Sequence, residues 1–385
     1  MRSERMVLPL LLAASFLTFT DRAELPPLFT TVADEFAVDA AVVTVAMTAY
    51  VAAYAVGQLG WGIAALRVGR VRLLVIALAA AAVGQLGTAI AWDPVSLTLA
   101  RITAGAAFAA IVPAALVWIG DNLDLRSRGA AAANLAVALS LGMTAGTAVA
   151  ALAGEWGAWR AVPASAALLA AVLAVLLART GEPVRVGPGL PVLAGFRVVL
   201  GDPWVVAVLL LTAVEGALLV GVFSYLPVAA EHGGAGTLVA GLVTALYGVA
   251  VIGSSLVLRL VLHRVVPAAV LGIAGAAIVA GYSLLALRTD AVAVAIAAAL
   301  LGLAWAAGHV QLQVWMTDAV ARSRPIGAAV FALALFGGGA IGAWLGGFAV
   351  AGLRFGLLFG VSALGGAAFA LAAAMSRSRY REREG

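Results

Sequence analysis

Two carboxylates and one arginine in the first and fourth long apolar stretches have the types and spacing needed to carry protons. Asp21 and Glu24 are three residues apart, so they lie on one face of a helix. If the two stretches cross a bilayer in opposite directions, Asp21 and Arg101 lie about 12 Å and about 10 Å from the same end, at a rise of about 1.5 Å per residue. We therefore predict that Arg101 pairs with Asp21 or Glu24.

This group predicts proton coupling. An acid in the middle of a membrane costs about 2.5 to 3.5 kcal/mol to insert, so such residues are seldom idle. Beside a guanidinium, a small rearrangement can switch a buried carboxyl between its protonated and ionised forms. The alternative is a static ion network that locks the first helix to the fourth. Arg22 points about 100° away from Asp21 on the same helix and is expected to face a different helix.

A third acid, Glu215, lies near the middle of the seventh apolar stretch. It predicts either recognition of a cationic substrate or a second proton site, and we place it with Asp21, Glu24 and Arg101 as a proton-coupling candidate. The alternative is a buried carboxylic acid held by hydrogen bonds.

Two polar stripes recur every four residues, so each lies on one helical face. The tenth stretch carries Trp305, His309 and Gln313, and the second carries Tyr50, Tyr54 and Gln58. Apolar pockets with a few polar groups hold small molecules, and aromatic rings suit planar or cationic ligands. The predicted substrate-binding residues are therefore Tyr50, Tyr54, Glu215, Trp305, His309 and Gln313. Helix packing with polar hydrogen bonds explains both stripes equally well.

The elements that position these residues are membrane helices. The chain is 64% hydrophobic and only 11% charged, with a mean hydropathy of +1.11, whereas a soluble domain has about 25% charged residues. Apolar stretches of about 18 or more residues recur, and none alternates as a membrane strand would. Because backbone groups in lipid must be satisfied within the segment, we predict an all-α membrane protein with twelve transmembrane helices. The predicted spans are 6–29, 41–65, 72–92, 94–119, 129–153, 160–178, 203–228, 237–262, 267–287, 290–316, 325–349 and 354–375.

The basic residues indicate an orientation. All 23 are arginine. Eighteen of them lie in the two termini and in every second loop, three lie in the opposite loops, and Arg22 and Arg101 lie within spans. The positive-inside rule then predicts that both termini are cytoplasmic. The lysine-free, alanine- and arginine-rich composition is typical of a GC-rich bacterial genome, so the expected location is a bacterial cytoplasmic (inner) membrane.

The absence of lysine and cysteine excludes several kinds of chemistry. A Walker A loop and a retinal or pyridoxal Schiff base each need a lysine, and thiolate metal sites and disulfides need cysteine. The three histidines (His232, His263 and His309) are too far apart in the sequence to indicate a metal cluster. We expect no catalytic residue, metal or cofactor. The net charge of +5 follows from the arginine topology and does not require a nucleic-acid partner.

An internal duplication divides the chain. Arg126-Ser127-Arg128 matches Arg322-Ser323-Arg324 at an offset of 196, and so do Gly142 and Gly146 with Gly338 and Gly342. At an offset of 197, Tyr50 and Arg67 match Tyr247 and Arg264. We predict two pseudo-symmetric six-helix bundles, 1–178 and 203–376, a cytoplasmic linker at 179–202 and a cytoplasmic tail at 377–385. The four glycines, spaced four apart in pairs, predict close helix packing.

The sequence resembles the major facilitator superfamily, most closely its twelve-span drug:proton antiporters. The loop that follows the second span has the spacing of that family's gating motif, with Leu66 in place of the usual acid. The motif residues are Gly62, Arg67, Gly69, Arg70 and Arg72. Arg101-Ile-Thr-Ala-Gly105 resembles a motif of the fourth helix, and Leu312 to Asp318 resembles the end of the tenth. Gly142-Met-Thr-Ala-Gly146 resembles the antiporter motif of the fifth helix, with Thr147 where those proteins have proline.

The resemblance and the buried charges together predict a secondary active transporter that exports small amphipathic or cationic compounds by alternating access, powered by a proton gradient. The first alternative is a proton-coupled carrier of a sugar or another metabolite. A membrane-embedded enzyme or a sensor is a further alternative, but the loops are too short to supply a catalytic cluster and no signalling domain is evident. The expected partners are a small-molecule substrate and membrane lipid, and the expected state is a monomer.

Overall fold

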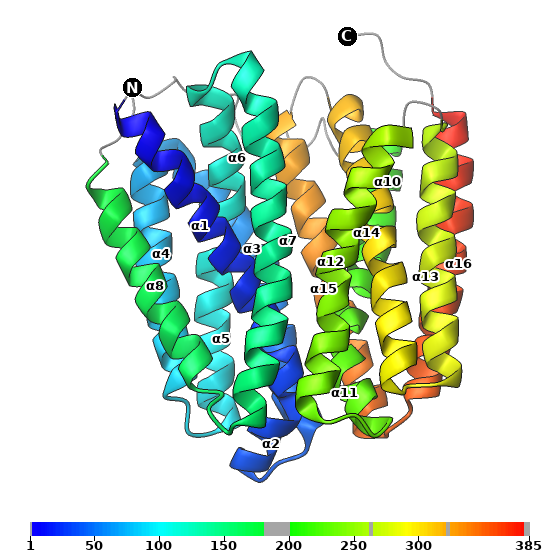
Figure 1. Ribbon diagram of the computed structural model, residues 1–385. Helices are drawn as coiled ribbons and strands as arrows, with labels where there is room; N and C mark the ends of the chain where they lie inside the picture. Colours follow the sequence, from blue (N-terminus) through cyan, green and yellow to red (C-terminus); the bar gives the residue numbers. More distant parts are fainter. Residues whose placement is uncertain (1, 181–200, 262–264, 321–323, 381–385) are drawn as a thin grey trace. The chain divides into compact units, whose positions relative to one another are not determined.

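The computed structural model describes residues 2–180, 201–261, 265–320 and 324–380, and all regular elements within these ranges are helices (Figure 1). The chain divides into two compact units, unit 1 at residues 1–189 and unit 2 at residues 190–385. This division falls in the segment 179–202 that the sequence predicts as a linker, most of which lies outside the described residues.

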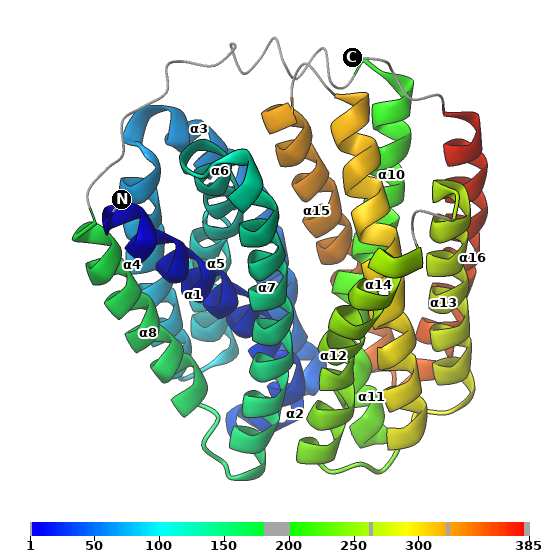
Figure 2. The same cartoon turned by 45° about the horizontal axis from the view of Figure 1, so that its top comes forward.

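Unit 1 is a bundle in which the first helix packs against the helix of the fifth span. Its elements are α1 (Arg2–Glu24), η1 (Pro26–Leu28), α2 (Phe29–Phe36), α3 (Ala40–Val68), α4 (Arg70–Ala89), α5 (Pro94–Phe108), α6 (Ile111–Asn122), α7 (Leu125–Glu155) and α8 (Ala161–Ala178). α1 packs against α7, α3 against α5, and α4 against both α5 and α8. Figure 2 shows α8 running beside α4, and α1 beside α7. α1 also packs against α6 and α8, and buried polar side chains link it to α4 and α5.

Unit 2 repeats this arrangement. Its elements are α10 (Pro203–Gly216), the π-helical turn η2 (Ala217–Gly221), the 3-10 turn η3 (Val222–Tyr225), α11 (Leu226–His232), α12 (Thr237–Val261), α13 (Pro267–Leu287), α14 (Ala291–Ala319), α15 (Arg324–Ala351) and α16 (Phe355–Arg379). α10 and η2 pack against α15, α12 packs against α14, and α13 packs against both α14 and α16. The helices that correspond to α1 and α5 of unit 1 are therefore α10 and α14.

Twelve helical segments within the described ranges are long and apolar enough to cross a membrane. This confirms the predicted fold class and number of spans. The first span continues to Phe36 instead of ending at 29, and the seventh continues to His232 instead of ending at 228. The last helix ends at Arg379, so it extends three residues into the predicted tail.

Three spans are broken into consecutive helices, which the predicted spans did not anticipate. Pro26 and Pro27 have no amide hydrogen, so α1 ends before them and a 3-10 turn follows. Pro113 leaves the carbonyl four residues earlier, that of Ala109, without its helical donor, and α5 and α6 separate at that point. The seventh span changes instead through the π-helical turn η2, a form that is frequent at functional sites.

Close helix contacts in unit 1 depend on two glycines of α7. A Cβ atom on Gly142 or Gly146 would meet the backbone carbonyl oxygen of Phe16 or Thr20 on α1. Thr20 Oγ1 also donates a hydrogen bond of 3.2 Å to the Gly142 carbonyl. A larger residue at either glycine would force α1 and α7 apart.

The same contact recurs in unit 2. A Cβ atom on Gly338 or Gly342 of α15 would meet the carbonyl oxygen of Ala213 or Ala217. The glycines of the two units are related by an offset of 196, and the carbonyls that they face by an offset of 197. The duplication found in the sequence is thus also a duplication of packing.

Acidic residues begin several of the helices. The Asp93 carboxylate accepts a hydrogen bond of 2.7 Å from the Ser96 amide, and the Asp202 carboxylate accepts one of 2.9 Å from the Trp204 amide. In both cases a proline occupies the first helical position, where its missing N–H leaves nothing unsatisfied. These residues fix where α5 and α10 begin, and therefore the register of Arg101 and Glu215.

Candidate functional site

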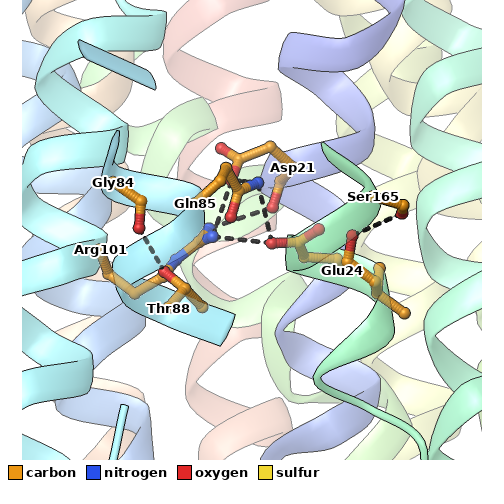
Figure 3. A network of polar contacts seen from close by, with 8 residues as sticks. Asp21, Glu24, Gly84, Gln85, Thr88, Arg101 and Ser165 are labelled. Carbon is orange, nitrogen blue, oxygen red and sulfur yellow. Dashed lines mark hydrogen bonds and ion pairs between the residues drawn. The ribbon is translucent and has the colours of Figure 1, made fainter. Parts of the chain in front are cut away.

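A buried polar network joins α1, α4 and α5 inside unit 1 (Figure 3). Arg101 Nη1 lies 2.7 Å from Asp21 Oδ1 and 2.9 Å from Glu24 Oε1, and Nη2 donates a 3.0 Å hydrogen bond to the Asp21 backbone carbonyl. The Asp21 and Arg101 side chains are fully buried, and that of Glu24 is 2% exposed. The predicted partners of Arg101 are therefore both in contact with it.

Gln85 completes the network and was not among the predicted residues. Its Nε2 donates to Asp21 Oδ1 at 2.5 Å and to Glu24 Oε1 at 3.1 Å, and the side chain is fully buried on α4. The only sequence signal was one amide in an alanine- and glycine-rich span, which equally fits helix packing. Gln85 and Arg101 donate to the same two carboxylate oxygens, so the carboxylates are held from two helices.

The charges of this network do not cancel when both acids are ionised. Two carboxylates and one guanidinium leave one excess negative charge in a site with no exposed charged atom of Asp21 or Arg101. An uncompensated buried charge is costly. Glu24 Oε2 has no hydrogen-bond partner among the described residues. One proton shared by the two acids would make the network neutral, so the arrangement is suited to taking up and releasing a single proton.

The motif Arg101-x-x-x-Gly105 has a local explanation. A Cβ atom on Gly105 would meet the Tyr50 carbonyl oxygen, so the glycine lets α3 approach α5 closely. This approach places the Tyr50 ring over Arg101, with Cζ 4.4 Å from the ring centroid, a favourable contact for a cation. The Tyr54 ring lies 6.2 Å from that of Tyr50, and both are buried. Tyr50 thus packs against the charged network from α3. Contact of Tyr50 or Tyr54 with a substrate stays a prediction.

Arg22 lies beside the network but on another face of α1. Its Cζ is 5.4 Å from the centroid of the Phe19 ring, and 5% of the residue is exposed. The expectation that Arg22 faces a different helix stays a prediction.

The predicted gating motif spans the junction of α3 and α4. Gly69 has a φ of +89°, which glycine adopts at little cost, and it separates the two helices. Arg70 forms an ion pair with Asp121 at the end of α6, which ties α4 to α6 within unit 1. Gly62 faces open space and Arg72 is exposed. The side chain of Arg67 lies outside the described part of the chain, and the gating role of the motif stays a prediction.

A second polar cluster lies in unit 2. His309 Nδ1 lies 3.1 Å from Glu215 Oε2, within hydrogen-bond distance, which joins α14 to α10. The Trp305 and His309 rings are stacked, with centroids 4.1 Å apart and planes 13° apart, and the Phe331 ring lies 5.5 Å from His309. Three predicted residues from two distant stretches therefore form one cluster.

Gln313, the third member of the predicted stripe, is exposed one turn further along α14. It lines a surface hollow together with Val310, Val314, Thr317 and Asp318. The structure does not place it with Glu215, and its contact with substrate stays a prediction. The described residues contain no group of three histidine or acidic side chains placed to hold a metal ion.

Comparison with known proteins identifies the family. The family model described as Major Facilitator Superfamily matches residues 11–343. The chain belongs to the major facilitator superfamily. Together with the twelve spans, this makes the chain an integral membrane transporter of small molecules and not an enzyme. No curated protein matches it in sequence.

Solved structures of superfamily transporters share this fold. A crystal structure of the nucleoside transporter NupG has a TM-score of 0.75 at 14% identity, covering 97% of this chain and 99% of that one. A bacterial homologue of the human lysosomal transporter Spinster has a TM-score of 0.77 at 14% identity, covering 99% and 98%. A D-xylose–proton symporter has a TM-score of 0.74 at 17% identity, covering 96% of each chain. At these identities the likeness shows the fold alone.

Proposed function

We propose that this superfamily member is a proton-coupled secondary transporter that exports small amphipathic or cationic compounds. In this proposal it works as a monomer in a bacterial cytoplasmic membrane, with both termini in the cytoplasm and with alternating access to the substrate site. The arginine distribution supports the orientation. The observation that carries the proton coupling is the contact of one buried arginine with two buried acids.

The network in unit 1 is the proton site. Releasing a proton leaves the excess negative charge buried between α1, α4 and α5, and rebinding it removes that charge. A change in packing that admits water would lower the cost of the ionised form. The two protonation states therefore favour different arrangements of these helices, which is the coupling that a proton-driven carrier requires.

The cluster in unit 2 supports a cationic or aromatic substrate. Glu215 supplies a negative charge, and the stacked rings of Trp305 and His309 supply a flat surface. Such a combination is suited to a positively charged, partly apolar compound.

The second candidate function is proton-coupled transport of a sugar or another metabolite. It is favoured by the solved structures with the same fold, which include transporters named for nucleosides and for D-xylose. Aromatic rings and hydrogen-bonding groups also suit these neutral compounds.

Transport by the purified protein in liposomes distinguishes these functions. Ethidium, D-xylose and a radiolabelled nucleoside would each be offered with and without an imposed pH gradient. We expect ethidium to accumulate against its own gradient only when the pH gradient is present, and a protonophore to abolish the accumulation. Asp21→Asn and Glu24→Gln should lose proton-driven accumulation, because each removes one titratable member of the network. Asp39→Asn is the matched control, since Asp39 is an acid that caps α3 outside the network.

Accumulation that is indifferent to the pH gradient, or that persists in both variants, would contradict proton coupling at this site. Proton-driven movement of D-xylose or the nucleoside, with none of ethidium, would replace the leading candidate by the second.

A further inference from the structure

Glu215 is a buried acid in which one carboxylate oxygen has a hydrogen-bond partner among the described residues and the other has none. The side chain is 1% exposed, and Oε2 shares a hydrogen bond of 3.1 Å with His309 Nδ1. Oε1 is also buried and has no hydrogen-bond partner among the described residues. It lies 3.4 Å from the place where a Cβ atom would sit on Gly308, so this glycine provides room beside the carboxylate. The carboxylate is therefore held from one side only.

His309 is the more exposed member of the pair that it forms with Glu215. Its side chain is 12% exposed, and Nε2 makes no hydrogen bond to any described residue. A positively charged imidazole would contact the Glu215 carboxylate through Nδ1 and the face of the Trp305 ring through stacking. These are two groups that attract a cation. The same two groups would attract a planar organic cation that took the place of the imidazole.

Few other groups in the described part of unit 2 can interfere. Tyr282 on α13 donates to the Leu218 carbonyl at 2.5 Å, Tyr225 donates to the Ala343 carbonyl at 2.5 Å, and the Tyr247 ring packs on Phe223. The described charged residues on these helices, and the other described histidine, lie at or near helix ends. They are Asp202, Glu231, His232, Arg259, Arg288, Asp290, Asp318, Arg324, Arg354, Arg377 and Arg379. His309 is therefore the group whose charge Glu215 meets directly.

We propose that Glu215 holds one cation at a time, either the imidazolium of His309 or a planar aromatic substrate that carries a positive charge. This rests on the proposed transport function and names the substrate class and the competitor at the unit 2 site. When the substrate cation binds beside the carboxylate, the imidazolium loses one proton to solvent and the neutral ring moves aside. One positive charge replaces another, so the charge of the site stays constant.

The sign of the pH effect follows from this exchange. Lowering the pH favours the imidazolium, which occupies the carboxylate and weakens binding of the substrate cation. Raising the pH favours the neutral imidazole, which removes the competitor and strengthens binding. A neutral compound of similar shape gains nothing from Glu215 and should bind without this dependence.

Unit 1 offers no equivalent site. At an offset of 197, Glu215 and His309 correspond to Thr18 and Val112, and Trp305 corresponds to Phe108. The aromatic surface is kept and both titratable groups are absent. The exchange is therefore a property of unit 2 and is separate from the proton site of unit 1.

Direct binding to the full-length protein in detergent tests the proposal. Ethidium affinity would be measured by calorimetry from about pH 5.5 to about pH 8.5, in two buffers of different ionisation enthalpy that report proton release. We expect affinity to rise with pH, with release approaching one proton per ethidium at the acidic end. Glu215→Gln should weaken binding by about tenfold or more at every pH, because the cation loses its counter-charge. His309→Gln should keep binding but lose most of the proton release and the pH slope.

Two matched controls and one separate variant make the result decisive. His232→Gln removes a histidine at the end of α11 and Glu231→Gln removes a nearby acid, and both should behave as the unaltered protein. Unchanged binding in Glu215→Gln, unchanged proton release in His309→Gln, or no ethidium binding by the unaltered protein would overturn the proposal. Asp21→Asn should abolish proton-driven transport while leaving this binding intact. A failure at Glu215 therefore leaves the proton site of unit 1 standing, and a failure at Asp21 leaves the exchange in unit 2 standing.

Discussion

Unit 1 and unit 2 share their backbone contacts but not their chemistry. A Cβ atom on Gly105 would meet the Tyr50 carbonyl oxygen, and one on Gly302 would meet the Tyr247 carbonyl oxygen 2.5 Å away. Both members of this pair are shifted by 197 residues. The close approach of α3 to α5 in unit 1 is therefore repeated by α12 and α14 in unit 2.

The buried charges of unit 1 have no counterpart at the same positions of unit 2. Asp21, Glu24, Gln85 and Arg101 correspond to Leu218, Gly221, Tyr282 and Ala298. The link between two helices survives without charge, because Tyr282 donates to the Leu218 carbonyl at 2.5 Å where Gln85 donates to Asp21. The two units therefore share their helix packing and differ in their buried polar groups. Unit 1 has the network around Arg101. Unit 2 has the cluster of His309 and Glu215, and Glu215 lies on α10 almost one turn before the counterpart of Asp21.

Removing the central cation should have the largest effect. Arg101→Gln leaves two buried carboxylates without their counter-charge, and breaking a buried ion pair costs about 3 to 5 kcal/mol. Tyr282→Phe at the counterpart of Gln85 removes one neutral hydrogen bond and should cost about 1 kcal/mol. Thermal unfolding of the purified variants measures both free energies. Equal losses would show that the network of unit 1 is an ordinary polar contact and that the two units do not differ here.

Closing the space at a packing glycine should have the next largest effect. Gly338→Ala puts a methyl group against the Ala213 carbonyl oxygen, and overpacking of this kind costs about 1 to 3 kcal/mol. Gly142→Ala in unit 1 should cost a similar amount, since it faces the Phe16 carbonyl in the same way. Gly337→Ala is the control, because no atom lies within 4 Å of its added Cβ. Because alanine has a higher helix propensity than glycine, Gly337→Ala should not destabilise the protein. A loss at Gly337 as large as that at Gly338 would mean that the contact with Ala213 does not explain the result.

The scaffold could be predicted from sequence because it depends on local and repeated signals. Hydropathy gave the spans, and the arginine spacing and glycine offsets gave the duplication. The pairing of Arg101 with Asp21 and Glu24 followed from their matching depths. The breaks were harder to predict. Pro113 was visible in the sequence, but the π-helical turn at Ala217–Gly221 has no comparable residue that would announce it.

The rest of the site depends on which helix faces which. Gln85 was missed because depth and periodicity do not show that α4 turns its amide toward α1. Glu215 and His309 were each predicted as site residues. Their contact was not predicted, because the two residues are 94 positions apart in the sequence and lie on different helices. Gln313 was grouped with His309 by spacing, yet four residues on a helix also carry it a full turn away, where it is exposed. Periodicity identifies a face and leaves open how far along that face a site extends.

A smaller effect is expected at two corresponding aspartates, one at the end of α6 in unit 1 and one at the end of α14 in unit 2. Asp121 forms an ion pair with Arg70, whereas its counterpart Asp318 accepts a 2.5 Å hydrogen bond from Tyr380. Tyr380→Phe should cost about 1 kcal/mol. Asp121→Asn should cost at most about 1 kcal/mol at low salt and less at high salt, because partly exposed charges are screened.

The salt dependence provides the control for this pair. Unfolding of Tyr380→Phe should respond to added salt as the unaltered protein does, since the tyrosine carries no charge. A loss in Asp121→Asn that is independent of salt would contradict the assignment of an electrostatic tie to unit 1.

The smallest effect is expected at the acids that begin these two helices. Asp93 and Asp290 are counterparts at an offset of 197. Hydrogen bonds from the side chain and backbone of Ser96 lower the pKa of Asp93, and a hydrogen bond from the Ala293 amide lowers the pKa of Asp290. A carboxyl whose folded pKa is below its unfolded value of about 3.9 adds stability above that pH, and the contribution is lost as the pH falls through the folded pKa.

The replacement of Ser96 by alanine tests this difference between the two caps. Position 96 corresponds to position 293, where unit 2 already has alanine. The melting temperature measured from about pH 6 to about pH 2.5 should decline less steeply in Ser96→Ala than in the unaltered protein. Asp93→Asn should remove this part of the decline while keeping stability at neutral pH, since asparagine also caps helices. An unchanged decline in both variants would show that the serine does not distinguish the two caps and that the acid sensitivity of the fold arises at other carboxyls.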